Sequence, residues 1–376
     1  MRDVRAALLA GGQGVRMGRL TQHTCKPMVP YAASCRLVDF SMANAVRSGV
    51  TEMVVLSHYI ERELIDHLLR HWEGEAAGAG DDRGLRIHCG PQDHLLPQGS
   101  SRRGGLPDGL QLPARPADQG IADALLASAE WLFAPGATDV LILHADHVYS
   151  FDYQSMLDEH RASGAAATIG VQRIERRFVQ LFGMVEVDGT NRVRRLVEKP
   201  ADPTSDLVFT AFCLFRIDAL RDALTALSRL PSGDWQHDIS RDVLPFMIAG
   251  GQPVHAHPVT GYWADIGTVE RYLLGHMELI RSPTALGLTD VPQTLPGPCP
   301  MRMEPDRVIT SGPVPANAHI REAVLYPGCV VEAGARIERS VVLPGARVRA
   351  GAEVRDTVVL EGETIAGSRS GIAALI

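Results

Sequence analysis

Three glycines and two cations near the start of the chain have the types and spacing of a phosphate-binding turn. Gly11, Gly12 and Gly14 follow a short apolar run, and Arg16 and Lys26 come soon after them. Glycines let the backbone approach a ligand closely and turn successive N–H groups toward phosphate oxygens. Arginine adds a planar fork for phosphate and lysine a movable point charge. The spacing is neither that of a P-loop nor GxGxxG, so a plain strand-to-helix turn stays open as the alternative.

Two aspartates are candidates for a Mg²⁺ site. Asp146 follows the continuous apolar run 139–144, which predicts a buried strand, and Asp265 precedes a glycine turn. Ligands of open α/β sheets bind at the carboxyl ends of strands, and Mg²⁺ prefers carboxylates together with substrate phosphates. Either aspartate could instead cap a helix. We interpret His147, beside Asp146, as structural rather than as a ligand.

A further acid and base stand together in Glu198-Lys199-Pro200. Proline biases the residue before it toward an extended conformation, so this segment is expected to leave both side chains at the end of a strand. A salt-bridged surface turn is the alternative.

The elements that must position these residues follow from hydrophobic periodicity. Apolar runs alternate with helix-like patterns through about residue 285, which is typical of βαβ units. We therefore predict an α/β, Rossmann-like domain with a mostly parallel sheet over residues 1–285, and a proline-rich linker over 286–315. The clearest predicted strands are 4–10, 51–57, 85–89 and 139–144, and the clearest predicted helices are 39–48, 60–71, 121–132 and 270–281.

The remaining residues, 316–376, repeat themselves. A glycine followed three residues later by Val or Ile recurs at intervals of 6, 11, 6 and 11 residues, so the period is 17. Six-residue units with one inward apolar side chain are typical of a parallel β-helix, and three units make one coil. We predict a short left-handed parallel β-helix of two to three coils. An ordinary antiparallel domain with glycine turns is the alternative. The repeat glycines are Gly328, Gly334, Gly345, Gly351 and Gly362.

Composition restricts the class of protein. The 376 residues are 45% hydrophobic and 22% charged, which excludes a disordered or fibrous chain. A net charge of −7 gives no basic footprint, so we expect no nucleic-acid and no membrane partner. The six cysteines are scattered without a CxxC pair, and no apolar run has the length of a signal peptide or membrane span. These features favour a soluble protein of the reducing cytoplasm.

Taken in order, the motifs resemble those of the sugar-1-phosphate nucleotidylyltransferases. They are GGxGxRM with a downstream KP, ADH at a strand end, EKP and WxDxGT. The segments 36–45, 120–124 and 237–242 are most similar to those of the glucose-1-phosphate adenylyltransferases, the ADP-glucose pyrophosphorylases. The β-helix belongs to the same resemblance, so nearly the whole chain is covered.

The resemblance implies a Mg²⁺-dependent reaction in which a nucleoside triphosphate and a sugar 1-phosphate give a nucleotide sugar and pyrophosphate. Arg16, Lys26 and Asp146 would be catalytic, and Asp146 and Asp265 would hold Mg²⁺. Residues implied to bind the nucleotide are Leu9, Ala10, Gly11, Gly12, Gly14, Gln92, Gly120 and Asp123. Residues implied to bind the sugar phosphate are Arg36, Gly183, Glu198, Lys199 and Thr210.

The sequence also departs from the adenylyltransferase pattern. Ala117-Asp118-Gln119 replaces an aromatic segment before residue 120, and Thr210-Ala211-Phe212 replaces Ser-Met-Gly. We expect Phe212 to reshape the sugar pocket. The alternative prediction is therefore the same chemistry on a cyclitol or unusual sugar 1-phosphate, with GTP as a possible donor.

Two other classes stay open. One is a non-catalytic regulatory subunit, against which the retained charged residues argue. The other is a hexapeptide acyltransferase, which would need a histidine within the coils, whereas His319 precedes the repeats. The resemblance further implies a homo-oligomer, a dimer or tetramer, formed through the β-helix.

Overall fold

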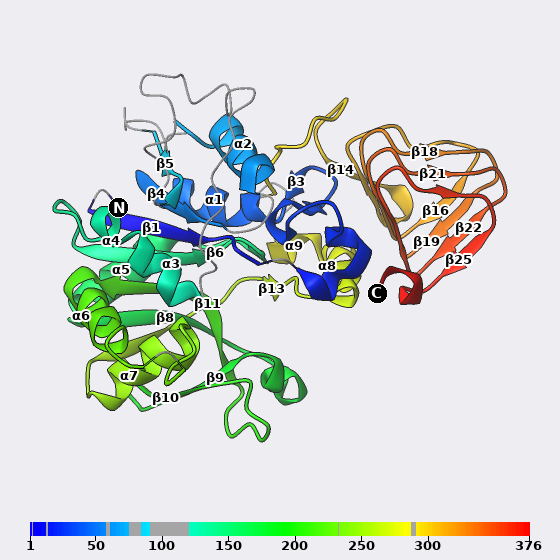
Figure 1. Ribbon diagram of the computed structural model, residues 1–376. Helices are drawn as coiled ribbons and strands as arrows, with labels where there is room; N and C mark the ends of the chain where they lie inside the picture. Colours follow the sequence, from blue (N-terminus) through cyan, green and yellow to red (C-terminus); the bar gives the residue numbers. More distant parts are fainter. Residues whose placement is uncertain are drawn as a thin grey trace. The chain divides into compact units, whose positions relative to one another are not determined.

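The protein is described by a computed structural model, in which two compact units are interleaved along the chain (Figure 1). The first unit contains Met1–Gly11, Asn44–His144 and Phe151–Thr260, and the second contains Gly12–Ala43, Ala145–Ser150 and Gly261–Ile376. The predicted linker 286–315 lies inside the second unit, and the division at this linker stays a prediction. The structure describes residues 1, 3–12, 14–57, 61–74, 84–90, 120–231, 233–286 and 291–376.

A nine-stranded mixed sheet forms the centre of the first unit. One part is parallel, as predicted, in the order β6-β1-β4-β5. The other part is joined to β6 through β11, which runs antiparallel to β6, β8 and β9. The parallel strands are β1 (Val4–Leu9), β4 (Glu52–Leu56), β5 (Arg86–His88) and β6 (Asp139–His144). The others are β8 (Ala167–Arg173), β9 (Gly183–Val187), β10 (Val193–Glu198), β11 (Leu207–Arg216) and β12 (Val254–Pro258).

The strands β1, β4 and β6 are mostly apolar because both faces are covered. Every residue of β1 is buried, as are all but the last of β6. This explains why apolar runs, rather than alternation, identified these strands. The antiparallel half was not foreseen because β8 to β11 follow one another without the α-helical crossover that would mark parallel pairing, whereas β12, which follows two helices, pairs in parallel with β8.

The helices of the chain agree with the predicted ones except at one point. The predicted helix 121–132 is interrupted at Ser128, whose φ and ψ of −104° and 13° are not helical. It forms α3 (Ile121–Ala127) and α4 (Ala129–Leu132) instead. The other helices are α1 (Val38–Arg47), α2 (Glu61–His71), α5 (Tyr153–Ala162), α6 (Ile217–Leu227), α7 (Leu244–Ala249), α8 (Val269–Arg281) and α9 (Pro283–Leu286).

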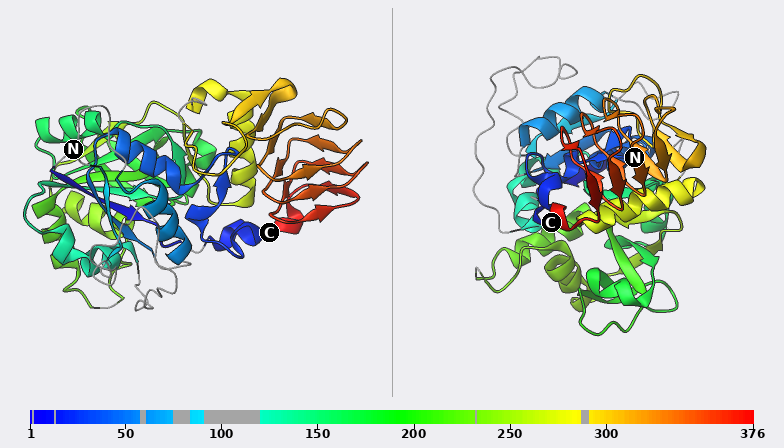
Figure 2. Two further views of the ribbon diagram at one scale, coloured as in Figure 1. Left: turned by 90° about the horizontal axis from the view of Figure 1, so that it is seen from above. Right: turned by 90° about the vertical axis from the view of Figure 1, so that its right-hand side faces the viewer.

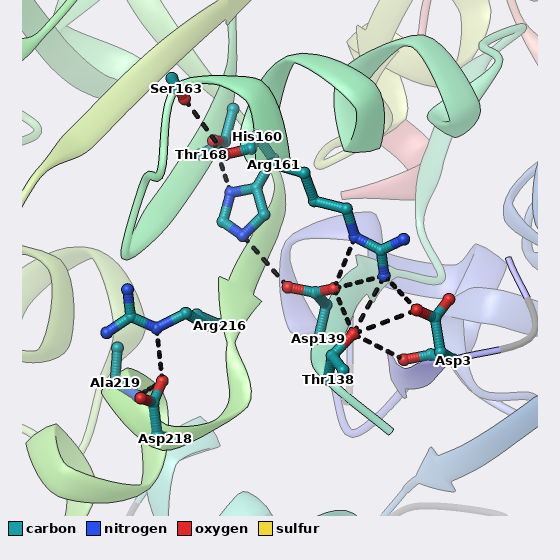
Figure 3. Close-up of polar contacts among 10 residues, drawn as sticks. All are labelled: Asp3, Thr138, Asp139, His160, Arg161, Ser163, Thr168, Arg216, Asp218 and Ala219. Atoms are coloured by element: carbon teal, nitrogen blue, oxygen red, sulfur yellow. Dashed lines mark hydrogen bonds and ion pairs between the residues drawn. The ribbon is translucent and has the colours of Figure 1, made fainter. Parts of the chain in front are cut away.

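A polar network ties the start of β6 to the end of α5 (Figure 3). The Asp139 carboxylate is almost fully buried and accepts hydrogen bonds from Arg161 Nη2 at 2.6 Å and Thr138 Oγ1 at 2.8 Å. His160 Nε2 lies 3.3 Å from its other oxygen, and His160 Nδ1 contacts Thr168 Oγ1 on β8. These contacts thus join α5 to β6 and β8 at the end of the sheet where both strands begin.

In the second unit, a short antiparallel pair and a helix surround the segments that follow the glycine turn. The pair consists of β7 (His147–Tyr149) and β13 (Trp263–Asp265), and α8 follows β13 directly. Two 3₁₀ segments, η1 (Val15–Thr21) and η2 (Lys26–Met28), follow the glycine turn, and η1 contributes Met17 and Leu20 to the apolar core of this unit.

The chain from residue 319 onward forms parallel coils stacked one on another, drawn orange to red in Figure 2. Ile320, Ile337 and Val354 pair in register on adjacent coils and point inward. Their spacing of 17 residues confirms the predicted β-helical repeat, and the parallel coils are consistent with a left-handed β-helix. The strands are β16 (His319–Arg321), β17 (Ala323–Leu325), β18 (Val330–Val331), β19 (Arg336–Glu338), β20 (Val341–Val342), β21 (Arg347–Val348), β22 (Glu353–Arg355), β23 (Val358–Val359), β24 (Thr364–Ile365) and β25 (Ser368–Ser370).

The turns of the coils use more than glycine. The five repeat glycines have φ between 68° and 76°, and a further corner of each coil is occupied by Glu322, Arg339 or Asp356 at φ of 43° to 50°. These three residues are also 17 apart, and Arg339 makes two 2.6 Å hydrogen bonds to Asp356 on the next coil. Cross-coil ion pairing offsets the strain of a left-handed non-glycine residue.

Part of the predicted linker is ordered as strands. The strands β14 (Arg302–Glu304) and β15 (Val308–Thr310) form a hairpin, and β15 pairs in parallel with β17 of the solenoid. Because the prolines before residue 300 predicted an irregular linker, the sequence analysis did not foresee this pairing. All six cysteines are present as thiols. Among the described helices, none combines the length and the apolar character that crossing a membrane requires.

Candidate active site

The glycine turn of the second unit depends on a residue without a side chain. Gly14 precedes η1 with φ of 71°, and a Cβ there would lie 2.9 Å from Thr21 Cγ2 and 3.0 Å from Lys26 Cβ. Thr21 Oγ1 donates to the Gly14 carbonyl at 2.9 Å, which closes the segment on itself. Gly12 has open space around it. The turn therefore brings Arg16 and Lys26 into one small region while keeping its backbone accessible at Gly12.

Lys26 lies between two carboxylates. Its Nζ is 2.5 Å from Asp146 Oδ2 and 3.6 Å from Asp265 Oδ1, and the lysine side chain is only 8% exposed. The two aspartates come together because Asp265 pairs with His147 in the β7–β13 ladder, and Asp146 directly precedes His147. The structure thus assembles the three residues that the sequence had separated by more than a hundred positions.

A second cation flanks the same carboxylates. Arg271, in the first turn of α8, donates to the Asp265 carbonyl at 3.0 Å and to Asp265 Oδ2 at 3.3 Å. The sequence reasoning missed Arg271, although its position three residues after the helix cap Thr268 placed it near Asp265. Two carboxylates, those of Asp146 and Asp265, and two cations, Lys26 and Arg271, therefore lie together in this cluster.

The orientation of His147 follows from its neighbour. Trp263 Nε1–H can only donate, and it donates to His147 Nδ1 at 3.3 Å. The proton of a neutral His147 is therefore assigned to Nε2, which lies 3.6 Å from Asp146 Oδ1 and 3.9 Å from Asp265 Oδ1. An N–H on that nitrogen faces the carboxylates and offers no lone pair to a metal. This arrangement agrees with a structural role for His147.

Arg16 is exposed and lies beside the same cluster. A Cβ on Gly267 would be 3.4 Å from Arg16 Nη2 and 3.3 Å from both carboxylate oxygens of Asp265. A side chain at Gly267 would therefore crowd both the guanidinium and the carboxylate.

Arg36 makes hydrogen bonds within its own unit that involve the backbone. Its Nη1 donates to the Met28 carbonyl at 2.6 Å, and its N–H donates to Asp39 Oδ2 at 2.7 Å. Met28 ends the 3₁₀ turn that begins at Lys26. The contacts of Arg36 hold the turn that carries Lys26, and its predicted contact with substrate stays a prediction.

Four of the five predicted sugar-phosphate residues lie in the first unit, whereas Arg36 belongs to the second. Glu198 ends β10 opposite Gly183 on β9, where an added Cβ would lie 3.0 Å from Glu198 Oε2. Lys199 follows with φ of 49°, and its Nζ is 3.8 Å from Glu198 Oε1. Ser240 Oγ lies within hydrogen-bonding distance of Glu198 Oε2, at 3.1 Å, and of Asp238 Oδ1. The sequence reasoning missed Ser240.

Gly120 and Asp123 meet a histidine of this unit. Asp123 Oδ1 is 2.6 Å from His237 Nδ1, and a Cβ on Gly120 would lie 2.3 Å from the His237 carbonyl oxygen. His237 has a left-handed φ of 58°, and its buried Nε2 has no hydrogen-bond partner among the described residues. The backbone conformation of Gly120 is extended, so its requirement is one of space rather than of φ.

Thr210 is buried in an irregular part of β11. The register of β11 against β8 shifts between Phe209 and Cys213, and Ala211 in the bulge has φ of 64°. The Phe212 ring packs against Phe151 and Tyr153 and is 1% exposed. An effect of Phe212 on a sugar pocket would therefore come through the bulged backbone, not through an exposed ring.

The remaining residues predicted to bind the nucleotide are Leu9, Ala10, Gly11 and Gln92. Leu9 and Ala10 are buried at and just after the end of β1, and the Ala10 N–H donates to the Leu56 carbonyl at 2.8 Å. Gly11 is the last residue of its segment in the first unit. Gln92 lies outside the described residues.

Comparison with known proteins decides the family. The profile of the nucleotidyl transferase family matches residues 5–282. The chain belongs to this family. A GlmU-like C-terminal hexapeptide profile matches residues 301–370 of this nucleotidyltransferase, in agreement with the observed coils. Both the predicted enzyme class and the predicted architecture are confirmed.

A curated relative refines the comparison. A valienol-1-phosphate guanylyltransferase from Streptomyces hygroscopicus subsp. limoneus is 47% identical over 338 residues, which cover 87% of this chain and 87% of the relative. The resemblance to ADP-glucose pyrophosphorylases is therefore corrected at the subfamily level, because this extensive match is to a guanylyltransferase. Within the nucleotidyltransferase class, the match favours the alternative prediction.

Proposed function

We propose that this nucleotidyltransferase transfers a guanylyl group from GTP to a cyclitol 1-phosphate of the valienol type. The observation that carries the proposal is the 47% identity to a valienol-1-phosphate guanylyltransferase along 87% of both chains. The loss of the adenylyltransferase segments before Gly120 and at 210–212 is consistent with it, since these segments were expected to contact base or sugar.

The proposed reaction is a displacement at phosphorus. An oxygen of the cyclitol phosphate forms a bond to the α-phosphorus of GTP, the bond from that phosphorus to the bridging oxygen breaks, and pyrophosphate leaves with the electron pair. No side chain has to supply or remove a proton in this step. The protein contributes by positioning the reactants and by offsetting negative charge.

The cluster of the second unit supplies the groups for that task. Lys26 would stabilise charge on the transferred phosphoryl group, and Arg16 would bind the leaving pyrophosphate. The low exposure of Lys26 strengthens its interaction with an anion, because a less aqueous environment screens charge weakly. The turn at Gly12 would offer backbone N–H groups to the phosphates.

Asp146 and Asp265 have the chemistry of a Mg²⁺ site. Two carboxylates from adjacent positions of a two-stranded ladder match the preference of Mg²⁺ for one or two carboxylates together with substrate phosphates. Bound Mg²⁺ would neutralise phosphate charge. Lys26 Nζ lies beside oxygens of both aspartates, so it is placed to contact the same phosphates.

The cluster of the first unit would recognise the acceptor. Glu198, with Ser240 beside it, would accept hydrogen bonds from cyclitol hydroxyls, and Lys199 would contact the phosphate. Gly183 leaves room beside the Glu198 carboxylate that a side chain would occupy. Thr210 and Arg36 remain proposed substrate residues.

The experiment is a substrate panel read as pyrophosphate release. GTP and ATP are each combined with valienol 1-phosphate and with glucose 1-phosphate, with Mg²⁺ and then with excess chelator. The proposal expects the highest kcat/KM for GTP with the cyclitol phosphate, and loss of the rate in chelator. Faster turnover of ATP with glucose 1-phosphate would instead support the adenylyltransferase prediction. Asp146→Asn serves as the inactive control.

We also propose that the chain assembles as a dimer or tetramer through the solenoid. A stack of coils presents open strand edges at its ends, which need capping or a partner. Light scattering on the eluting protein measures the mass of the assembly, and a monomer at micromolar concentration would contradict the proposal.

A further inference from the structure

The turn η9 (Ala373–Leu375), which follows the last strand of the solenoid, contacts the segment that carries Arg16. Within the second unit, the Leu375 backbone passes directly over Gly18: a Cβ built on Gly18 would lie 2.1 Å from the Leu375 carbonyl oxygen and 3.2 Å from Ile376 Cα. No side chain can occupy that position without displacing the chain. Gly18 also has φ of 51° and ψ of −128°, which breaks the helical path of η1 in its middle.

Side chains complete the contact. Leu375 is fully buried and belongs to the same apolar cluster as Met17 and Leu20, which flank Gly18 on η1. Arg16 and Arg19 of the same segment are exposed. The segment therefore buries Met17 and Leu20 in the cluster of Leu375 and leaves its cations exposed.

An ion pair supports the same arrangement. Arg19 Nη1 lies 3.5 Å from Glu363 Oε1 on the last complete coil. Glu363 is itself held by two hydrogen bonds from Arg369, at 2.7 Å and 3.0 Å, and by the Leu360 N–H. The acceptor for Arg19 is thus a preorganised carboxylate of the solenoid.

We propose that Leu375 is a positioning residue for the transferase reaction: its side chain, buried in the cluster that contains Met17 and Leu20, holds its main chain over Gly18 and so fixes the 3₁₀ segment. The Arg16 guanidinium thereby stays beside Gly267 and Asp265. This inference rests on the proposed role of Arg16 in binding pyrophosphate. The physical reason is that η1 is short and is kinked at Gly18. The solenoid supplies the rigidity that the segment lacks.

The prediction concerns pyrophosphate rather than the acceptor. In Leu375→Ala, the loss of the buried side chain lets η1 relax, and misplacement of the guanidinium is expected to weaken product inhibition by pyrophosphate about ten-fold. The KM for the acceptor phosphate stays within about two-fold, because Glu198 and Lys199 belong to the other unit and Arg36 contacts the turn at Met28 rather than η1. Leu375→Met, which nearly conserves the volume, restores pyrophosphate binding.

A matched control separates positioning from general stability. Leu325 is as buried as Leu375 but belongs to the solenoid's own core cluster, so Leu325→Ala should lower Tm without weakening pyrophosphate inhibition. Ile376→Ala changes an exposed side chain in the next position and should alter neither quantity.

A double-mutant cycle tests whether Leu375 acts through Arg16. If it does, Leu375→Ala causes little further loss of pyrophosphate binding once Arg16 is replaced by glutamine. Full additivity, or an effect of Leu375→Ala no larger than that of Leu325→Ala, would overturn the inference. If Arg16→Gln alone leaves pyrophosphate inhibition unchanged, the proposed role of Arg16 fails, and the inference fails with it for that separate reason.

Discussion

The stability of the first unit should depend on one buried carboxylate at the start of β6. Burial by itself would raise the pKa of Asp139, but hydrogen bonds from His160, Arg161 and Thr138 outweigh it and hold that pKa below its ordinary value. A depressed pKa in the folded state means that the ionised carboxylate stabilises the fold above the unfolded pKa of about 3.9. That stabilisation is lost as the pH falls through the folded pKa. The test is Asp139→Asn.

The magnitude follows from burial and from the partners. Removing one member of a fully buried ion pair costs about 3–5 kcal/mol. The Arg161 side chain is 41% exposed, so solvent screens part of the interaction, and asparagine keeps the shape and one acceptor oxygen. We expect a loss of about 2 kcal/mol at pH 7, within the range of charged hydrogen bonds.

Asp218→Asn is the matched control (Figure 3). Asp218 also accepts a 2.6 Å hydrogen bond from an arginine, Arg216, but both side chains are about half exposed. Such a pair contributes about 0–1 kcal/mol. The comparison therefore isolates the effect of burying the carboxylate.

Thermal unfolding at a series of pH values measures the effect. A loss of 2 kcal/mol corresponds to about 4–8 °C in Tm for a unit of 150–250 residues. The difference between wild type and Asp139→Asn should begin to shrink below the unfolded pKa of about 3.9 and should vanish as the pH falls through the lower folded pKa, where the wild-type carboxyl becomes neutral. Hydrogen exchange of peptides covering β6 and α5 assigns the change to the first unit. Equal losses for Asp139→Asn and Asp218→Asn, or a difference independent of pH, would refute the reasoning.

Three further predictions concern the candidate site. Lys26→Gln should lower kcat at least about 100-fold, as expected for loss of a charge-stabilising group. Arg195→Gln, on an exposed face, should leave kcat unchanged. Similar kcat values for the two variants would exclude the role of Lys26. Gly14→Ala should lower Tm and kcat, because φ is 71° and a Cβ meets Thr21, and Gly12→Ala, with open space around it, serves as the steric comparison in the same melting experiment. Glu198→Gln should raise the KM for the acceptor phosphate about ten-fold with the KM for GTP unchanged, as for a single lost hydrogen bond to substrate, and a rise in the KM for GTP instead would contradict its assignment to the acceptor.

Regular periodicity made much of the fold predictable. The fully buried strands β1, β4 and β6 appear in the sequence as unbroken apolar runs bounded by turns. The solenoid appears as a 17-residue period because each coil must place the same small residue at the same corner. What the sequence did not reveal was irregular pairing. The hairpin β14–β15 follows a proline-rich segment in which the sequence predicted an irregular linker, and the corners at Glu322, Arg339 and Asp356 carry no glycine.

In the candidate site, too, some residues were predicted from the sequence and others were missed. The types and order of its main residues led to the prediction of phosphate and metal chemistry at Arg16, Lys26, Asp146 and Asp265, and the structure brings these four residues together. Arg271, Ser240 and His237 were missed as site residues, because each acts through a contact with a residue distant in sequence or beyond a turn. A cation one turn into a helix is unremarkable until the aspartate before that helix is known to face Lys26.

The sequence by itself determined the class of this protein: an α/β nucleotidyltransferase followed by a β-helix. Local patterns carry that information, since the buried strand, the glycine turn and the repeat are each contained within a few tens of residues. Only the tertiary structure decided how the charges are paired. Lys26 approaches Asp146 and Asp265 because β7 and β13 align in one register, and η1 keeps its path because Leu375 packs on Gly18. Contacts between residues hundreds of positions apart depend on the folded chain, because no local propensity encodes which distant segments meet.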